Sequence, residues 1–406
     1  MNPVIKAYIN GHQTQMFGLL KELVSIQSGS RNKEGIDRVG RRIAMEMEAM
    51  GFFCEFQKET KYGSHLIARS FDPKESDPNK YGPNRSDPNK SGLCGPTTGC
   101  DKRQILITGH MDTVFPADTA FNYYKEDENS CFGPGVADMK GGLVVGIFAL
   151  KALCQADLIH KNRITFIFNS DEEIGSPSSR ALIRKEAEKS RLAYVLEAGG
   201  LAGEIVTGRK GNMSIRLGVE GEAGHAAFAG RDKASAILEL AHKTIAIEGL
   251  NNPEKGITAN VGTVEGGIGS NTIAQHAKAA IDLRFLSAGE DEILKRKLEK
   301  IVSGQTIPGT RAQMTVTSSR PAMPQNPANT DLFNRIKILA AELKIAVKPE
   351  LRQGVSDANI IALAGIPVID GLGPIGAKDH SEDEYIQKSS LPERAILFGN
   401  ILACID

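Results

Sequence analysis

The sequence has no excess of charge of either sign. Lys plus Arg number 49 and Asp plus Glu number 49 in the 406 residues, so the formal net charge is zero. Nucleic-acid binding normally requires a basic excess that displaces counterions, and the chain has no basic amphipathic stretch of the kind that binds membrane surfaces. We therefore expect neither a nucleic acid nor a membrane as a partner.

Long apolar runs are also lacking. No segment approaches the about 18 consecutive apolar residues of a membrane-spanning helix. The amino-terminal residues read MNPVIKAYINGHQTQ and contain neither the apolar core nor the cleavage site of a secretory signal. On this basis we expect a cytoplasmic protein.

Cysteine is sparse, and its spacing excludes two kinds of site. None of the six cysteines belongs to a C-x-x-C pair, which argues against a thiolate zinc site and against a thioredoxin-like redox motif. Cys94 and Cys100 are close enough in sequence to close a small loop. In a chain without a secretory signal, we expect both to be reduced thiols.

Strand-like and helix-like apolar patterns alternate in the first half of the chain. The expected helices are 14–26, 35–50, 140–154 and 177–189, and the expected strands are 104–109, 163–169 and 193–196. Strands that alternate with helices predict an α/β protein with a doubly wound, mostly parallel sheet.

A second pattern begins near residue 210. The strands 212–219 and 277–285 and the helices 231–247 and 290–302 predict a small α+β, ferredoxin-like domain at 210–321. The first pattern then returns with helices 329–344, 356–364 and 390–404 and a strand at 366–370. The larger domain is therefore expected to comprise 1–209 and 322–406. Its segment 72–100 is rich in Pro, Gly, Asn and Ser, which predicts a flexible insertion.

Polar side chains follow the first of these strands directly. The segment GHMDTV, after the strand 104–109, contains His110 and Asp112. His110 offers an imidazole ligand, and Asp112 is placed to hold the other ring nitrogen. Taken alone, a His-x-Asp triplet is more typical of an ordinary turn.

Asp138 lies in the glycine-rich segment GPGVADMKGG at the start of a helix, where its ordinary role is that of an N-cap.

Acidic residues also follow the next strands. Asp171, Glu172 and Glu173 come after 163–169, and a solvated charge run is the usual interpretation of such a cluster. A bound dication would instead neutralise their mutual repulsion, with Glu172 and Glu173 divided between base and ligand.

Two further segments complete the set. Glu197 ends the strand 193–196, and His380 lies in a glycine-rich loop before the last helix. In an α/β sheet, sites gather at the carboxyl ends of the strands. Together these segments supply imidazoles and carboxylates, which are ligands suited to zinc or cobalt.

The motifs occur in the order GHMDTV, GPGVADMKGG, DEEIGS, LEAGG, GHAA, SNTIA with IDLRF, GVSDAN and KDHSEDEY. In this set the sequence resembles the di-zinc amidohydrolases and exopeptidases, a family that includes carboxypeptidase G, acetylornithine deacetylase, succinyl-diaminopimelate desuccinylase and aminoacylase. The resemblance covers the chain except 72–100 and is strongest to the carboxypeptidase G branch. It implies a zinc-peptidase-like, doubly wound mixed sheet with an inserted dimerisation or lid domain.

The resemblance also implies a metal centre. Asp138 would bridge two zinc ions, with Co²⁺ as an alternative. His110 and Glu197 would complete one site. Glu173 and His380 would complete the other.

The remaining roles follow from the same resemblance. Glu172 would be the general base and Asp112 would orient His110, and the family has a cis peptide after its bridging Asp, here Asp138–Met139. Two dications lower the pKa of a bridging water and polarise the scissile carbonyl. Glu172 can then take the proton of that water and pass it to the leaving amine.

Other motif residues are expected to act on the substrate. His225 would stabilise the oxyanion and, as in the family, reach the active site of a partner subunit, which implies a homodimer. Substrate binding would fall to Asn271, Arg284, Arg320 and Gly354. Arg binds carboxylates bidentately, which would select a free carboxylate, although a surface or strand-edge arginine is an equally open interpretation.

The sequence therefore predicts a zinc-dependent hydrolase that releases a carboxy-terminal amino acid from a small peptide or an N-acyl amino acid. An N-acyl-amino-acid deacylase with the same chemistry and a different side-chain pocket stays open. A non-catalytic dimeric binding protein is a third alternative, and the presence of Glu172 and of every ligand position argues against it.

Overall fold

The computed structural model describes residues 2–73, 103–230 and 233–404. The expected insertion from residue 74 onward, and with it Cys94 and Cys100, lies outside the described residues. The chain divides into two compact units. The first comprises Met1–Thr207, Asn326–Glu350 and Ala364–Asp406, and the second comprises Gly208–Gln325 and Leu351–Leu363.

The first unit is built on a six-stranded mixed sheet, which confirms the predicted α/β class. Its strand order is β1-β2-β6-β3-β7-β16. The strands β6, β3, β7 and β16 run parallel to one another, whereas the pairings of β1 with β2 and of β2 with β6 at one edge are antiparallel. Their bounds are β1 (Phe53–Gln57), β2 (His65–Arg69), β6 (Ile164–Asn169), β3 (Gln104–His110), β7 (Ser190–Val195) and β16 (Val368–Ile369).

The central strands are buried along their length. Every residue of β3 and β6 is buried, as expected for parallel strands that are covered on both faces. The neighbours β6, β3 and β7 run in the same direction, so their carboxyl ends meet at one edge of the sheet. His110 ends β3 and pairs in register with Asn169 at the end of β6. The segments that follow these strands are therefore brought together.

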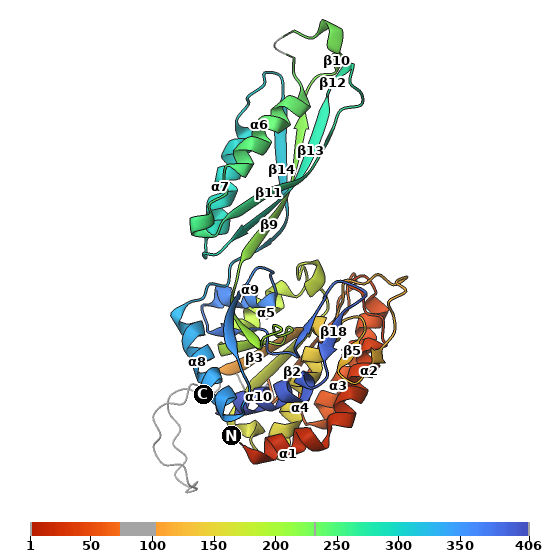
Figure 1. Cartoon of the computed structure of the whole chain (residues 1–406), viewed down its shortest axis with the longest axis vertical. Coiled ribbons are helices and arrows are strands. Elements are labelled where there is room, and N and C mark those ends of the chain that lie inside the picture. The colour runs from red at the N-terminus through yellow and green to blue at the C-terminus, as the bar shows by residue number, and fades with distance from the viewer. Residues whose placement is uncertain (1, 74–102, 231–232, 405–406) are drawn as a thin grey trace. The chain divides into compact units, whose positions relative to one another are not determined.

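Helices accompany the sheet, and three of them, α1, α4 and α10, pack side by side (Figure 1). The helices of this unit are α1 (Pro3–Gly11), α2 (Gln13–Val24), α3 (Lys33–Ala49), α4 (Gly141–Gln155), α5 (Arg180–Ala187), α8 (Pro327–Glu342) and α10 (Ser390–Cys404). The first turn of α4 packs closely against Leu196. A Cβ on Gly142 would lie 1.8 Å from the carbonyl oxygen of Leu196. Only glycine fits at this position.

A small sheet joins two loops of the first unit. Its strand order is β17-β18-β5-β4, with β17 (Gly376–Ala377), β18 (Tyr385–Gln387), β5 (Ser130–Phe132) and β4 (Lys125–Glu126). The pairing of β18 with β5 places Tyr385 opposite Phe132. The glycine-rich segment after β5 and the turn between β17 and β18 are thereby neighbours.

The second unit contains a four-stranded antiparallel sheet of order β11-β13-β9-β14. Its strands are β11 (Thr258–Gly266), β13 (His276–Phe285), β9 (Gly211–Glu220) and β14 (Arg311–Arg320), and its main helices are α6 (Ala236–Glu248) and α7 (Glu290–Ser303). Both helices pack against the sheet and each other. Alternate side chains of β9 and β13 are buried beneath them, as the half-solvated strand pattern predicts.

A short helix, α9 (Asp357–Ile361), also belongs to the second unit. The sequence pattern places it in the larger domain because it follows α8. Its side chains instead bond to the second unit: the Asn359 amide donates to the carbonyl oxygens of Lys210 and Pro321 at 3.0 and 2.8 Å. Within the described ranges, no helix is long and apolar enough to cross a membrane.

We expect a buried ion pair to stabilise the second unit. Lys243 and Glu239 are 2.9 Å apart with side chains 3% and 1% exposed. Lys243 also donates to three carbonyl oxygens at the end of α7, the shortest contact being 2.6 Å to Gly304. Lys243→Met would leave a buried carboxylate without its cation, and we expect this to cost about 3–5 kcal/mol, measured by urea unfolding.

The matched control is an exposed ion pair in the same unit. Lys278 and Glu265 are also 2.9 Å apart, but their side chains are 70% and 66% exposed. Lys278→Met should change the unfolding free energy by about 1 kcal/mol or less. Equal losses in the two variants would contradict the importance of the buried pair.

Candidate metal centre

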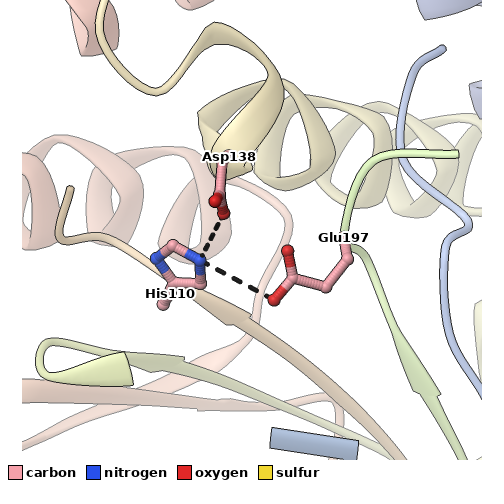
Figure 2. Close-up of side chains that lie close together, drawn as sticks. All are labelled: His110, Asp138 and Glu197. Atoms are coloured by element: carbon pink, nitrogen blue, oxygen red, sulfur yellow. Dashed lines mark hydrogen bonds and ion pairs between the residues drawn. The ribbon is translucent and has the colours of Figure 1, made fainter. Parts of the chain in front are cut away.

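Acidic and imidazole side chains meet at the carboxyl edge of the central sheet. His110 is the last residue of β3, and Glu197 follows the end of β7. Asp138 lies at the entrance to α4, within η1 (Val136–Lys140). The imidazole Nε2 of His110 lies 2.9 Å from Oδ1 of Asp138 and 3.7 Å from Oε1 of Glu197. Figure 2 shows the three side chains pointing toward one another from these elements.

A second group forms on the other oxygen of Asp138. The imidazole Nε2 of His380 lies 3.2 Å from Oδ2 of Asp138 and 3.4 Å from Oε2 of Glu173. In each group the potential ligand atoms lie within 4.8 Å of one another. All five residues that the resemblance assigns to a metal centre are thus brought into two groups that share Asp138.

The loop that carries Asp138 has an unusual backbone. The Asp138–Met139 peptide is cis, as the resemblance implies. Gly135 begins the turn with a φ of 78°, a conformation that favours glycine. The loop's buried N–H groups bond to the carboxylate of Glu384, a residue that the sequence pattern did not single out.

Asp112 holds two parts of the site together. The His110 Nδ1 lies 3.0 Å from the carbonyl oxygen of Asp112 and 3.4 Å from its carboxylate. The same carboxylate accepts hydrogen bonds from the backbone N–H groups of Glu172 and Glu173 at 3.2 and 3.3 Å, and from the Ser30 hydroxyl at 2.7 Å. With a proton on Nδ1, His110 presents the lone pair of Nε2 to Asp138 and Glu197, the arrangement that metal coordination requires.

Asp171 does not join the cluster. Its carboxylate accepts hydrogen bonds from the hydroxyls of Ser178 and Ser179 at 2.7 and 2.5 Å, and from their backbone N–H groups. Asp171 therefore fixes the turn after η3 (Glu172–Ile174). Of the three adjacent carboxylates, only Glu173 belongs to a ligand group among the described residues.

The pKa values of several side chains in the cluster depart from their usual values. Burial alone would lower the pKa of His110, but hydrogen bonds to Asp112 and Asp138 outweigh it and hold the pKa well above its usual value. Hydrogen bonds to Asp138 and Glu173 raise the pKa of His380 to about 11. Burial, together with the charge of Asp138, raises the pKa of Glu173 to about 8.

Glu197 shows the same effect. Burial and the nearby charge of Asp138 raise the pKa of Glu197 well above its usual value. Carboxylates crowded in this way favour protonation unless another cation neutralises them. Each group offers one imidazole and two carboxylates, a donor set that fits a divalent transition metal such as zinc. The arrangement therefore fits a pair of dications.

The expected substrate-binding residues lie in the second unit. His225, in β10 (Gly224–His225), is exposed, and its Nδ1 accepts a hydrogen bond from the backbone N–H of Ala227. Asn271 and Gly354 are also exposed. These residues remain predicted substrate contacts.

The two candidate arginines differ sharply. Arg284 is partly exposed, and its Nε donates to Asp282 at 2.7 Å. Arg320 is only 2% exposed and pairs with buried Asp357 at 3.2 Å. Of the two, Arg284 is therefore the more accessible to a substrate carboxylate.

The fold is an α/β domain with a mixed sheet, and two candidate ligand groups that share a carboxylate lie at the carboxyl edge of that sheet. This is the architecture of a metal-dependent hydrolase. The chain belongs to peptidase family M20/M25/M40, whose family model matches residues 106–403. The predicted family and its metallopeptidase activity class are thereby confirmed.

Individual relatives agree with this assignment. The chain is 27% identical over 394 residues to carboxypeptidase G2 of Pseudomonas sp. (strain RS-16), covering 96% of this chain and 89% of that protein. Its fold is similar to that of aminopeptidase PepT from Bacillus cereus, with a TM-score of 0.76, 23% identity, and coverage of 96% of this chain and 98% of that chain. It is also similar to Sso-CP2, an M20 family metallo-carboxypeptidase from Sulfolobus solfataricus, with a TM-score of 0.67, 17% identity, and coverage of 96% and 98%.

Proposed function

We propose that the protein is a di-zinc exopeptidase that releases a carboxy-terminal amino acid, with glutamate as the first candidate. The observation that carries the proposal is the shared carboxylate: Asp138 contacts His110 with one oxygen and His380 with the other. A similar sequence in carboxypeptidase G2 supports a substrate with a free carboxylate.

The chain's own groups divide the work of amide hydrolysis. When bound, two dications would lower the pKa of a water molecule and polarise the scissile carbonyl. Glu172 lies on the turn beside the ligand groups, and its backbone is held by Asp112. From there its carboxylate takes the proton of the attacking water and delivers it to the leaving amine.

The second unit supplies the remaining proposed roles. His225 donates to the developing oxyanion, and Asn271 and Arg284 bind the carboxylate of the substrate. The exposed position of His225 is consistent with its use in the active site of a partner subunit, so we propose a homodimer. Sedimentation of the purified protein tests that state directly.

Removal of the metal tests the proposed function. We expect the zinc-loaded protein to hold two ions per chain and to release glutamate from N-acyl-glutamates or folate-type glutamates. Dialysis against a chelator should abolish release, and added Zn²⁺ or Co²⁺ should restore it. Metal content by mass spectrometry and free glutamate by an amino-acid assay give the result. Full activity in the metal-free protein would refute the proposal.

A panel of substrates distinguishes the amino acid that is released. N-acyl derivatives of glutamate, of neutral amino acids and of ornithine differ in side chain while keeping the same amide bond. Preference for ornithine or for succinylated substrates would show that the enzyme is an N-acyl-amino-acid deacylase. Preference for glutamate would support the carboxypeptidase.

A further inference from the structure

We infer that Glu384 is a positioning residue that fixes the loop carrying Asp138 to the segment carrying His380, so that the ligands are arranged before a metal binds. The inference rests on the proposed metal centre and deepens it. Glu384 itself belongs to neither ligand group.

The carboxylate of Glu384 bonds only to the backbone of this loop in the hydrogen bonds of the described chain. Its Oε1 accepts from the N–H groups of Ala137 and Asp138 at 2.8 and 2.9 Å, and its Oε2 accepts from the N–H of Gly135 at 2.9 Å. The carbonyl oxygen of Glu384 accepts from the N–H of Gly133 at 3.4 Å. The buried residue Glu384 therefore binds the backbone N–H groups of four residues in the loop.

A carboxylate suits this position because its two oxygens accept several hydrogen bonds at once and donate none. Gly135 directly precedes η1, and Ala137 and Asp138 lie in its first turn, where backbone N–H groups lack partners within the helix. Without Glu384 these donors would lose their partners in a buried place, a state that is costly. Burial raises the pKa of Glu384 to about 7, and the hydrogen bonds from the loop oppose that rise. Lys140 is also buried and donates to the carbonyl oxygen of Ile26 at 2.9 Å, and burial lowers its pKa to about 7.

Glu384 also lies at a junction between the two ligand segments. The hairpin of β17 and β18 has His380 in its turn, and Glu384 directly precedes β18. β18 pairs with β5, the strand that leads into the loop of Asp138. Hydrogen bonds within the turn also hold it. In one of them the backbone N–H of Glu384 donates to the carbonyl oxygen of Ser381 at 3.2 Å. A shift of Glu384 would therefore move Asp138 relative to His380.

Glu384→Gln tests this role with little change in size. The amide keeps one acceptor oxygen but directs an NH₂ group toward backbone N–H donors. Residues that support ligands in this way typically contribute 10–100-fold in metal affinity. We expect a loss of about that size when Co²⁺ is titrated into the metal-free protein, together with a changed visible absorption spectrum of the bound Co²⁺.

Glu382→Gln is the matched control. It removes the same charge from the same turn, but Glu382 is exposed. This variant should bind Co²⁺ with the affinity and spectrum of the original protein. A change of spectrum confined to Glu384→Gln supports a positioning role, because a general loss of stability would not alter the coordination geometry of bound ions.

Hydrogen exchange of the unaltered, metal-free protein decides the question if Glu384→Gln does not fold. The amides of Gly135, Ala137 and Asp138 should exchange slowly, since Glu384 holds them without a metal. Rapid exchange of these amides would overturn the inference. So would a folded Glu384→Gln variant with unchanged Co²⁺ affinity and spectrum. Failure of the original protein to bind Co²⁺ would instead overturn the metal centre itself, which keeps the two failures distinct.

Discussion

Glu172→Gln is expected to keep its metal ions and to lose about 10²–10⁴-fold in kcat, the usual contribution of a positioned general base. Glu172 lies outside both ligand groups, so its replacement should leave metal content unchanged. The amide cannot take a proton from water at neutral pH. Steady-state hydrolysis of an N-acyl-glutamate, with zinc content measured on the same sample, gives both quantities.

Two control variants make the result specific. Glu173→Gln, one residue along the chain, should lose metal as well as turnover, because Glu173 lies 3.4 Å from His380 within a ligand group. Glu188→Gln removes an exposed carboxylate that pairs with Arg184 on α5, and it should change neither quantity. Near-normal kcat in zinc-loaded Glu172→Gln would contradict the assignment of the base.

The buried parallel strands could be predicted from the sequence because they are continuous apolar runs. The expected strand 163–169 corresponds to Ile164–Asn169, and 104–109 corresponds to Gln104–His110. The strand β11 was not anticipated, since most of its residues are exposed and it lacks a regular alternation. β1 was also missed: it is a short strand at the sheet edge with no fully buried residue. Edge strands depend on their neighbours for their structure, and a single sequence gives little sign of this.

The grouping of the candidate ligands was predictable for a different reason. Each polar segment follows a strand, and parallel strands bring such segments to one edge. The resemblance then distinguished Glu173 from Asp171, a distinction that spacing alone did not make. The structure supplies a physical reason, because Ser178 and Ser179 bind the carboxylate of Asp171.

Residues that hold distant parts of the site together escaped prediction. Glu384 holds N–H groups about 250 positions earlier in the chain, as its 249-residue separation from Gly135 shows. Ser30 bonds to Asp112 across 82 residues. Glu384 lies within the motif KDHSEDEY. The local sequence does not reveal the partner of either residue, because the folded sheet determines that partner. Arg320 was expected to bind the substrate, whereas its side chain is buried beside Asp357.

Asp138→Asn is expected to have the broadest effect on the metal centre. Asp138 provides one oxygen to each ligand group, at 2.9 Å from His110 and 3.2 Å from His380. A neutral amide in its place weakens both groups at once. Loss of the metals removes several kcal/mol of transition-state stabilisation, so kcat should fall by about 10³-fold or more at about 1.4 kcal/mol per tenfold.

Variants of residues that belong to one group separate the two sites. Glu197→Gln should weaken only the group that contains His110, and His380→Ala only the group that contains Glu173, because neither side chain is shared. Each should therefore retain one tightly bound ion per chain in equilibrium dialysis, whereas Asp138→Asn retains neither. Asp383→Asn, which changes an exposed carboxylate paired with Lys378, should retain both ions. If Asp138→Asn loses no more metal than the single-group variants, Asp138 is not the shared ligand and the two groups bind their ions independently.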